Sequence, residues 1–284
     1  MEFVTKLILK EVYKPRPEWS HKGMFGRLAC VVGSERLTGS PIFVGMAAYR
    51  AGCDLVFLIG PRRAMDVAAN YSPVLITQPL EGKRLERRHV KNVISFIKEV
   101  SATAMVIGPS LWRAPPTRRA IIEIIKKVDL PMVIDADAIR AISAAKKILT
   151  KKKAIVTPHS DEFYALTGIK PSLHPEKRIK IVEEQAKLLK TVILLKGRVD
   201  VISDGSRTAL NKTGVPALTV GGVGDTLAGV CGALLAKNID VFTAACAAAY
   251  INGLAGEFAA KEFGVGLLPT DLIEKIPEVI KPGF

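Results

Sequence analysis

One stretch of the chain combines glycine, a carboxylate and an apolar segment in an order that favours anion binding beside an acidic residue. Three glycines within residues 221–224 precede Asp225, and residues 226–236 are small and apolar, as expected of a buried helix. Glycine lets the backbone take positive φ and approach a ligand closely, and the first amides of a helix favour an anion. Asp225 could act as a base toward a hydroxyl or hold a metal. A structural role as helix N-cap fits the same residues, so both interpretations stay open here.

A second group of polar residues follows an apolar run at 154–156. His159 could hydrogen-bond a ligand or act as an acid or base. Glu162 could organise a magnesium ion through water, because Mg²⁺ keeps several waters and uses few carboxylates. The structural alternative is a helix start, with Ser160 as its cap and acidic residues in a first turn that the helix dipole favours.

Two further apolar runs end in charged residues. Asp135 and Asp137 lie on the same side of the chain and could bind a metal or a hydroxyl. Asp137 also suits the N-cap of the next helix, and we expect that structural role for it. Lys196 can meet a phosphate, and Gly197 lets a base or sugar lie on the backbone. The chain has no GxxxxGK[ST], no GxSxG and no convincing GxGxxG after its first strand, which disfavours P-loop, hydrolase and Rossmann folds.

These candidates need a scaffold, and apolar runs alternating with helical segments predict one. Strands are expected at residues 27–33, 54–60, 74–77, 104–109, 131–137, 154–158 and 191–197, with a hairpin at 199–211. Helices are expected at 42–51, 89–101, 117–128, 138–145, 162–167, 179–189, 226–236, 241–263 and 271–279, after an extended lead-in over residues 1–20. The alternation predicts a single α/β domain over residues 1–284, with a mostly parallel sheet covered on both faces. Ligands of such sheets bind at the carboxyl ends of the strands, where the candidate residues fall.

Composition narrows the class of protein. A chain of 284 residues that is 49% hydrophobic can build one large core. The net charge is +14, but aromatics do not interleave with the basic clusters and no nucleic-acid-binding motif is visible, so we expect no nucleic-acid partner. We expect a cytoplasmic protein without a membrane span or signal peptide. The four scattered cysteines predict free thiols rather than a zinc site.

In combination, these motifs resemble the ADP/ATP-dependent NAD(P)H-hydrate dehydratase family of the ribokinase-like superfamily, from about His21 to Pro277. The resemblance implies a ribokinase-like three-layer αβα domain, and we expect no epimerase domain. It is carried by Gly108-Pro109-Ser110-Leu111, Asp135-Ala136-Asp137, Thr157-Pro158-His159 with Glu162, Leu195-Lys196-Gly197 and Gly222-Val223-Gly224-Asp225, and by residues 21–26, 33–34, 39–41, 48–52 and 270–272.

The resemblance also implies a reaction and a set of roles. A hydroxyl on the hydrated nicotinamide ring is phosphorylated from ADP or ATP with Mg²⁺, and loss of the phosphate restores the double bond. Asp225 would be the base, and the amides of Gly222, Val223 and Gly224 the anion hole. The nucleotide would contact Lys196, Gly197, Arg198, Val199, Asp200 and Gly224. The hydrate would contact Ser40, Gly108, His159 and Asp225, and Glu162 would hold Mg²⁺ indirectly through water.

The resemblance has further implications for assembly and partners, and two alternative functions stay open. The family suggests a homo-oligomer that acts with a separate epimerase. One alternative is a small-molecule kinase of the same superfamily, acting on a sugar, thiazole or pyrimidine alcohol. Another is a nucleotide-binding regulator without catalysis.

The chain departs from the family pattern at a few positions. Ser40 stands where Ala is usual, and Ser110 and Trp112 stand where the family has glycines. Val223 replaces a threonine, while Thr226 restores a Gly-Asp-Thr pattern seen in sugar kinases. We expect these changes to affect the acceptor more than phosphate transfer.

Overall fold

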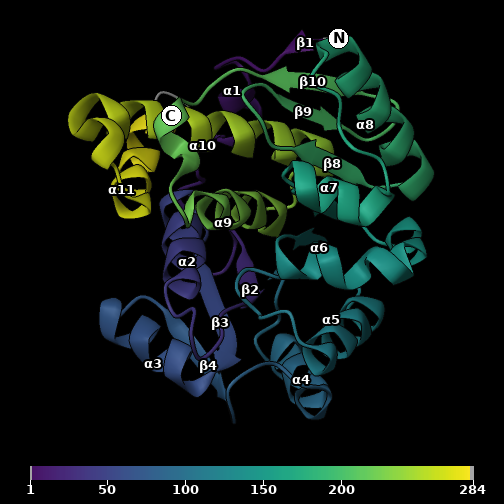
Figure 1. Ribbon diagram of the computed structural model, residues 1–284. Coiled ribbons are helices and arrows are strands. Elements are labelled where there is room, and N and C mark those ends of the chain that lie inside the picture. The colour runs from purple at the N-terminus through teal and green to yellow at the C-terminus, as the bar shows by residue number, and fades with distance from the viewer. Residues whose placement is uncertain (1, 282–284) are drawn as a thin grey trace.

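A mostly parallel sheet forms the centre of the molecule (Figure 1). The computed structural model describes residues 2–281, and within them ten strands make one sheet. Across the sheet the order is β1 (Glu2–Phe3), β10 (Thr208–Asn211), β9 (Asp200–Ser203), β8 (Val192–Leu195), β7 (Ala154–Val156), β6 (Met132–Ile134), β5 (Ala104–Ile107), β2 (Arg27–Val31), β3 (Leu55–Pro61) and β4 (Ile76–Leu80). The seven neighbouring strands from β8 to β4 run parallel, and the β8–β9 and β9–β10 pairs are antiparallel.

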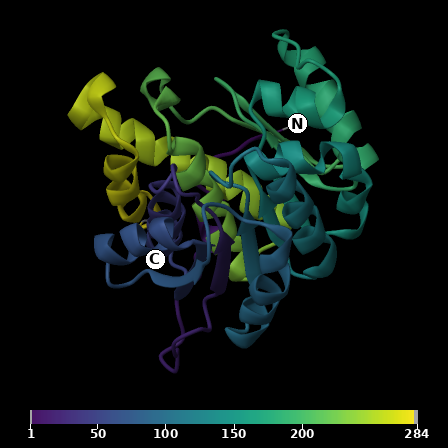
Figure 2. The same cartoon turned by 60° about the horizontal axis from the view of Figure 1, so that its bottom comes forward.

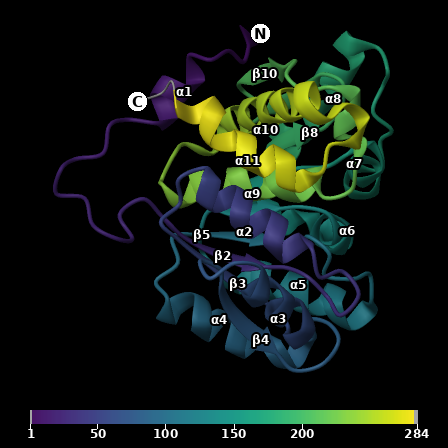
Figure 3. The same cartoon turned by 90° about the vertical axis from the view of Figure 1, so that its left-hand side faces the viewer.

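Helices cover one face of the sheet with close packing between small residues. Figure 3 shows this face, with α10 (Val241–Phe263), α11 (Pro269–Ile280), α9 (Val223–Ala236) and α2 (Ser40–Arg50) lying across the sheet. A Cβ on Gly229 would stand 2.3 Å from the Val44 oxygen, so this glycine lets α9 and α2 approach each other closely. The elements of this face are α1 (Ile8–Val12), α2 (Ser40–Arg50), α3 (Arg62–Tyr71), α9 (Val223–Ala236), α10 (Val241–Phe263) and α11 (Pro269–Ile280).

The opposite face carries a second core and completes three layers. Its apolar residues, such as Phe163 and Ile124, pack between the helices and the other side of the same strands. The predicted α/β fold class, with a mostly parallel sheet covered on both faces, is therefore confirmed. The elements here are η1 (Arg87–His89), α4 (Val90–Glu99), α5 (Pro115–Lys127), α6 (Asp137–Ile142), η2 (Ser143–Lys151), α7 (Ser160–Thr167) and α8 (Pro175–Leu189), with η3 (Pro216–Thr219) and η4 (Gly264–Gly266) in connecting loops.

The structure differs from the expected elements in a few places. The lead-in is not wholly extended: it forms β1 and α1, and Leu9, Val12 and Tyr13 join the core because their spacing gives α1 an apolar side. Residues 14–24 then loop away from the body of the molecule (Figures 2 and 3). Helix α3 was not predicted, and α6 ends at Ile142, where a 3-10 segment takes over.

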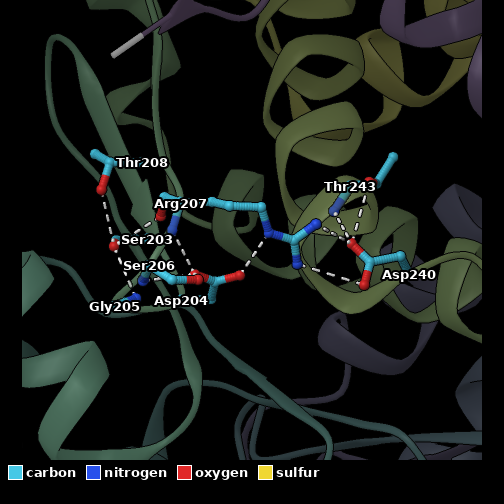
Figure 4. Close-up of polar contacts among 8 residues, drawn as sticks. All are labelled: Ser203, Asp204, Gly205, Ser206, Arg207, Thr208, Asp240 and Thr243. Atoms are coloured by element: carbon cyan, nitrogen blue, oxygen red, sulfur yellow. Dashed lines mark hydrogen bonds and ion pairs between the residues drawn. The ribbon is translucent and has the colours of Figure 1, made fainter.

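Long-range contacts also fix the edge of the sheet far from the strand carboxyl ends. Arg207, in the β9–β10 turn, bonds through Nε to Asp204 Oδ2 at 2.7 Å and through Nη1 to Asp240 Oδ2 at 3.1 Å (Figure 4). Asp240 in turn accepts from the Thr243 amide and caps α10. This network ties the hairpin to the start of α10.

Helix α10 is the most apolar long helix. With the turn after it, Val241–Gly266 has the length and composition to cross a membrane, yet 61% of its most apolar 18-residue window is buried inside the molecule. Such burial is typical of a helix in the core of a folded domain.

Candidate active site

The start of α9 presents free backbone amides at the carboxyl edge of the sheet. Gly222 has φ +105°, and a Cβ there would lie 2.7 Å from the Phe43 ring and 2.9 Å from Pro269, so only glycine fits. Within residues 2–281, no oxygen accepts from the amides of Gly222, Val223 or Gly224. Unpaired amides and the helix dipole together favour an anion at this position.

Asp225 lies in the first turn of α9 but does not cap it. Gly222 is the N-cap and no side chain accepts from the first-turn amides, so the structural alternative for Asp225 is wrong. Instead, Ser40 Oγ donates to Asp225 Oδ2, and Ser110 Oγ lies within hydrogen-bond distance of Ser40 Oγ. Three side chains from α9, α2 and the loop after β5 thus form one connected group.

The environment of Asp225 makes it a suitable base. Burial raises the pKa of its carboxyl to about 6, with the nearby Asp135 charge acting in the same direction and the Ser40 hydrogen bond and Lys196 opposing it. A carboxylate with this pKa is ionised at neutral pH and still accepts a proton more readily than an exposed aspartate does.

A lysine stands between two buried carboxylates beside the free amides. Lys196 Nζ is 3.2 Å from Asp135 Oδ1 and 3.9 Å from Glu162 Oε2, and a Cβ on Gly224 would be only 3.5 Å from this ammonium. Burial opposes its charge, but Asp135 and Glu162 outweigh that effect and raise the pKa of Lys196. Asp135 is 1% exposed and also accepts from Thr157 Oγ1 at 2.7 Å. A permanent cation therefore faces the position where the amides favour an anion.

The residues around His159 form a helix cap, one residue earlier than expected. The Asp161 amide donates to His159 Nδ1 at 3.1 Å, and the His159 amide donates to Glu162 Oε2 at 3.0 Å. This reciprocal pair is a capping box, so Ser160 is the first helical residue and not the cap. The imidazole stays 47% exposed, with Nε2 3.3 Å from Glu162 Oε1. His159 can thus contact a ligand while it caps α7.

Magnesium would have to rely on few protein ligands here. Among residues 2–281, no three His, Cys, Asp or Glu side chains cluster as metal ligands. Glu162 is only 6% exposed, and both its oxygens already have partners. This donor set suits an indirect contact through water, with nucleotide phosphates as the direct ligands.

The predicted nucleotide-binding loop, residues 196–200, is held mainly by its own polar groups. Asp200 accepts from the Gly197 amide at 2.9 Å and from Asn211 Nδ2 at 3.0 Å, and burial raises its pKa. Arg198 turns toward the hairpin and donates to the Lys212 oxygen, while Val199 packs against the core. Asp200 and Arg198 therefore shape the loop, and its backbone remains for contact with a nucleotide.

Arg178, in α8, supports this loop but was missed in the sequence. Its Nη2 donates to the Lys196 oxygen at 2.9 Å, and burial lowers the pKa of its guanidinium. A Cβ on Gly197 would lie 2.8 Å from Arg178 Nη2, so the glycine makes room for this contact. Nothing in the charged repeat of α8 distinguishes Arg178 from its neighbours, and only the packing of α8 reveals it.

The loop after β5 keeps a glycine-like backbone despite its substitutions. Gly108 is required, because a Cβ there would lie 1.8 Å from the Asp135 oxygen. Ser110 and Trp112, at positions where the resemblance led us to expect glycine, have φ of +56° and +76°. Asp137 supports this loop by accepting from the Trp112 amide at 2.9 Å and from Arg113 Nε at 3.0 Å. The expected cap role of Asp137 is therefore wrong, since its carboxylate is used by the loop and not by its own helix.

Thr226 does not restore the hydroxyl that Val223 removes. It is fully buried, and its Oγ1 donates to the Val223 oxygen and Asn252 Oδ1, both at 2.7 Å. Its hydroxyl therefore links α9 to α10 and has no access to a bound phosphate.

A three-layer α/β fold with free helix amides, a lysine and a carboxylate at one edge defines a ribokinase-like protein. The NAD(P)H-hydrate dehydratase family model matches residues 28–278, and the chain belongs to this family. The predicted family is thus confirmed.

Known relatives fall into two lengths. The chain is 44% identical over 264 residues to a bifunctional NAD(P)H-hydrate repair enzyme from Pyrobaculum aerophilum, covering 92% of this chain and 52% of that protein. It therefore spans about half the length of such relatives. It is 37% identical to the ADP-dependent (S)-NAD(P)H-hydrate dehydratase of Nitrosopumilus maritimus, covering 98% and 96% of the two chains.

A solved structure is also similar over the whole chain. The ADP/ATP-dependent NAD(P)H-hydrate dehydratase of Bacillus subtilis, co-crystallised with ATP and Mg²⁺, superposes with a TM-score of 0.82 at 26% identity. The match covers 100% of this chain and 99% of that one.

Proposed function

We propose that this protein dehydrates NAD(P)H hydrate at the expense of ADP. The observation that carries the proposal is the meeting of Asp225, the free amides of residues 222–224 and Lys196 at the start of α9. The relative from Nitrosopumilus maritimus, which this chain matches almost end to end, bears that activity in its name.

The proposed reaction has two steps, phosphoryl transfer and then elimination of phosphate. The terminal phosphoryl group of ADP forms a bond to the hydrate hydroxyl oxygen and leaves AMP. The carbon–oxygen bond then breaks, phosphate departs with the bonding electrons, a neighbouring carbon loses a proton, and the nicotinamide double bond returns. Asp225 would take the hydroxyl proton in the first step.

The surrounding residues would stabilise the charge that moves. The amides of Gly222, Val223 and Gly224 would bind the transferring phosphoryl group as an anion hole, and Lys196 would offset its charge. The backbone of residues 196–200 would hold the nucleotide, and Ser40, Gly108 and His159 the hydrate. Glu162 would hold Mg²⁺ through water, and the ion would neutralise the phosphates.

Incubating the protein with NADH hydrate and ADP, and separately with ATP, tests this function. We expect the absorbance of NADH to return, with AMP and phosphate formed in equal amounts when ADP is used. Asp225→Asn is the matched inactive control, with a loss of about 10²–10⁴ in rate. No recovery with either nucleotide contradicts the proposal, and a phosphorylated product that persists favours a small-molecule kinase.

We also infer a cytoplasmic homo-oligomer that works with a separate epimerase. The relative from Pyrobaculum aerophilum is named a bifunctional repair enzyme, which supports a second repair activity that accompanies dehydration. Light scattering of the purified protein tests the oligomer, and faster repair of racemised hydrate on adding an epimerase tests the partnership.

A further inference from the structure

A cavity of about 450 Å³ opens between the first turns of α5 and α6, which lie side by side (Figure 1). Its walls include the apolar side chains of Ile121, Ile122 and Ala141 and the indole of Trp112. Four arginines also line it, from the loop before α5 and from both helices: Arg113, Arg118, Arg119 and Arg140. The volume is that of a small-molecule site, and the lining is strongly cationic.

The positive charge in this arginine cavity is poorly balanced. Asp137 is the carboxylate that lines it, and its oxygens already accept from the Trp112 amide and Arg113 Nε. Within residues 2–281, Arg118, Arg119 and Arg140 have no carboxylate partner. Arg140 Nε is buried and has no hydrogen-bond acceptor in that part of the chain. Buried charged donors are normally satisfied, so the cavity has the features of an anion site that lacks its anion.

The arginine cavity lies beside the loop that reaches Asp225. Trp112, on its wall, follows Ser110 in that loop, and Ser110 Oγ is within hydrogen-bond distance of Ser40 Oγ, the donor to Asp225. Asp137, also on the wall, raises the pKa of Asp225 after burial and Asp135. The cavity follows β5 and β6, whereas the loop expected to hold ADP follows β8, two strands further along the sheet. The cavity therefore lies on the acceptor side of the site and apart from the predicted ADP loop.

Trp112 separates this cavity from a second basic hollow. That hollow, of about 180 Å³, is also lined by Ser34, Glu35, Arg36, Lys83 and Arg84, and Glu35 pairs with Lys83 at 3.6 Å. The Arg36 guanidinium lies 5.1 Å from the Trp112 ring centroid, and the indole is 36% exposed. An exposed aromatic ring flanked by arginines can stack on a base while the guanidinium groups pair with phosphates.

We propose that the arginine cavity binds the adenosine-phosphate end of NAD(P)H hydrate while the hydrated nicotinamide lies at Asp225. This inference rests on the proposed function, which requires an acceptor with two bridging phosphates and an adenine remote from the reacting ring. Arginine suits phosphate because its planar fork makes paired hydrogen bonds. Trp112 provides an exposed aromatic surface for the adenine.

A kinetic comparison tests the proposal. The double variant Arg118→Ala/Arg119→Ala removes two cavity arginines from α5, and Lys126→Ala/Lys127→Ala removes the same charge from the other end of that helix. We expect the first variant to raise the KM for NADH hydrate by about tenfold or more, as for lost charge-assisted contacts, with kcat and the KM for ADP within about twofold. The control should match the wild type. An unchanged KM for the hydrate, or a raised KM for ADP instead, overturns the assignment.

A binding measurement separates this inference from the reaction itself. The chain has two tryptophans, so Trp19→Phe leaves Trp112 as the fluorescent reporter at the cavity. ADP-ribose, which lacks nicotinamide, should quench this fluorescence saturably, and Arg118→Ala/Arg119→Ala should weaken its binding about tenfold or more. Equal binding by the double variant refutes the cavity. Weakened binding in a protein without dehydratase activity refutes the proposed function and keeps the cavity as an adenosine-phosphate site.

Discussion

Removing the hydroxyl of Ser40 should shift the pH dependence of catalysis. Ser40 Oγ donates to Asp225 Oδ2 and so favours the ionised carboxylate, against the burial that raises the pKa of Asp225 to about 6. A hydrogen bond to a charged group contributes about 1.5–3 kcal/mol, and about 1.4 kcal/mol corresponds to one pKa unit. Because Asp225 is only part-buried, we take the lower limit and expect Ser40→Ala to raise its pKa by about one unit.

The sign of the effect follows from the role of the base. Asp225 must be ionised to accept a proton, so activity is present above its pKa and lost below it. At about pH 6, half of the wild type and about one tenth of the variant would be ionised, so kcat/KM should fall about fivefold. At about pH 8 and above Asp225 is ionised in both proteins, so any difference in kcat/KM that is left there reports the proposed contact of Ser40 with the hydrate.

The assay is kcat/KM for NADH hydrate at saturating ADP, measured from about pH 5 to about pH 9. Ser206→Ala is a matched control, because it removes another serine hydroxyl from an aspartate, Asp204, at the far edge of the sheet (Figure 4). Ser110→Gly should give a smaller shift, since its hydroxyl reaches Asp225 only through Ser40. Overlapping acid limbs refute the reasoning. A uniform loss at every pH, with no shift of the acid limb, does so too, because it would leave the proposed contact of Ser40 with the hydrate as its only effect on catalysis.

Three other predictions concern stability and magnesium. Asp225→Asn should raise the free energy of unfolding by about 1–3 kcal/mol at pH 7. The reason is that burial raises the pKa of Asp225 above its value in the unfolded chain, so the ionised carboxylate destabilises the folded state. Urea denaturation should show that this gain in stability fades as the pH falls from about 6 to about 4. Lys196→Met should lower that free energy by about 3 kcal/mol, since it leaves Asp135 buried without a cation, and adding Asp135→Asn should recover part of the loss. Glu162→Gln should keep the cap of α7 and change the free energy of unfolding by less than about 1 kcal/mol. It should raise the Mg²⁺ concentration for half-maximal activity about tenfold. An unchanged Mg²⁺ response rules out the indirect role of Glu162.

Several features of this protein were determined by local sequence. Apolar runs alternating with helical segments encode parallel strands and covering helices, because each pattern acts through neighbouring residues and their spacing. The glycines before Asp225 encode a helix start with positive φ, and Gly222 takes it because its surroundings leave no space for a Cβ. Since parallel strands present their carboxyl ends at one edge, Asp135, His159 and Lys196 could be assigned to one site from sequence alone.

Only the tertiary structure determined which polar side chains contact one another. Ser40 and Asp225 are 185 residues apart, and Ser40 and Ser110 are 70 apart, so their contact depends on how α2, α9 and the loop after β5 pack. The same holds for Asp137, which supports the Trp112 loop, and for Arg178 behind the nucleotide loop. The arginine cavity is formed by two helices whose basic residues look like solvated surface in the sequence. Hydrophobic spacing specifies an element and its buried side, but the partner of a polar side chain is set by long-range packing geometry that no local pattern contains.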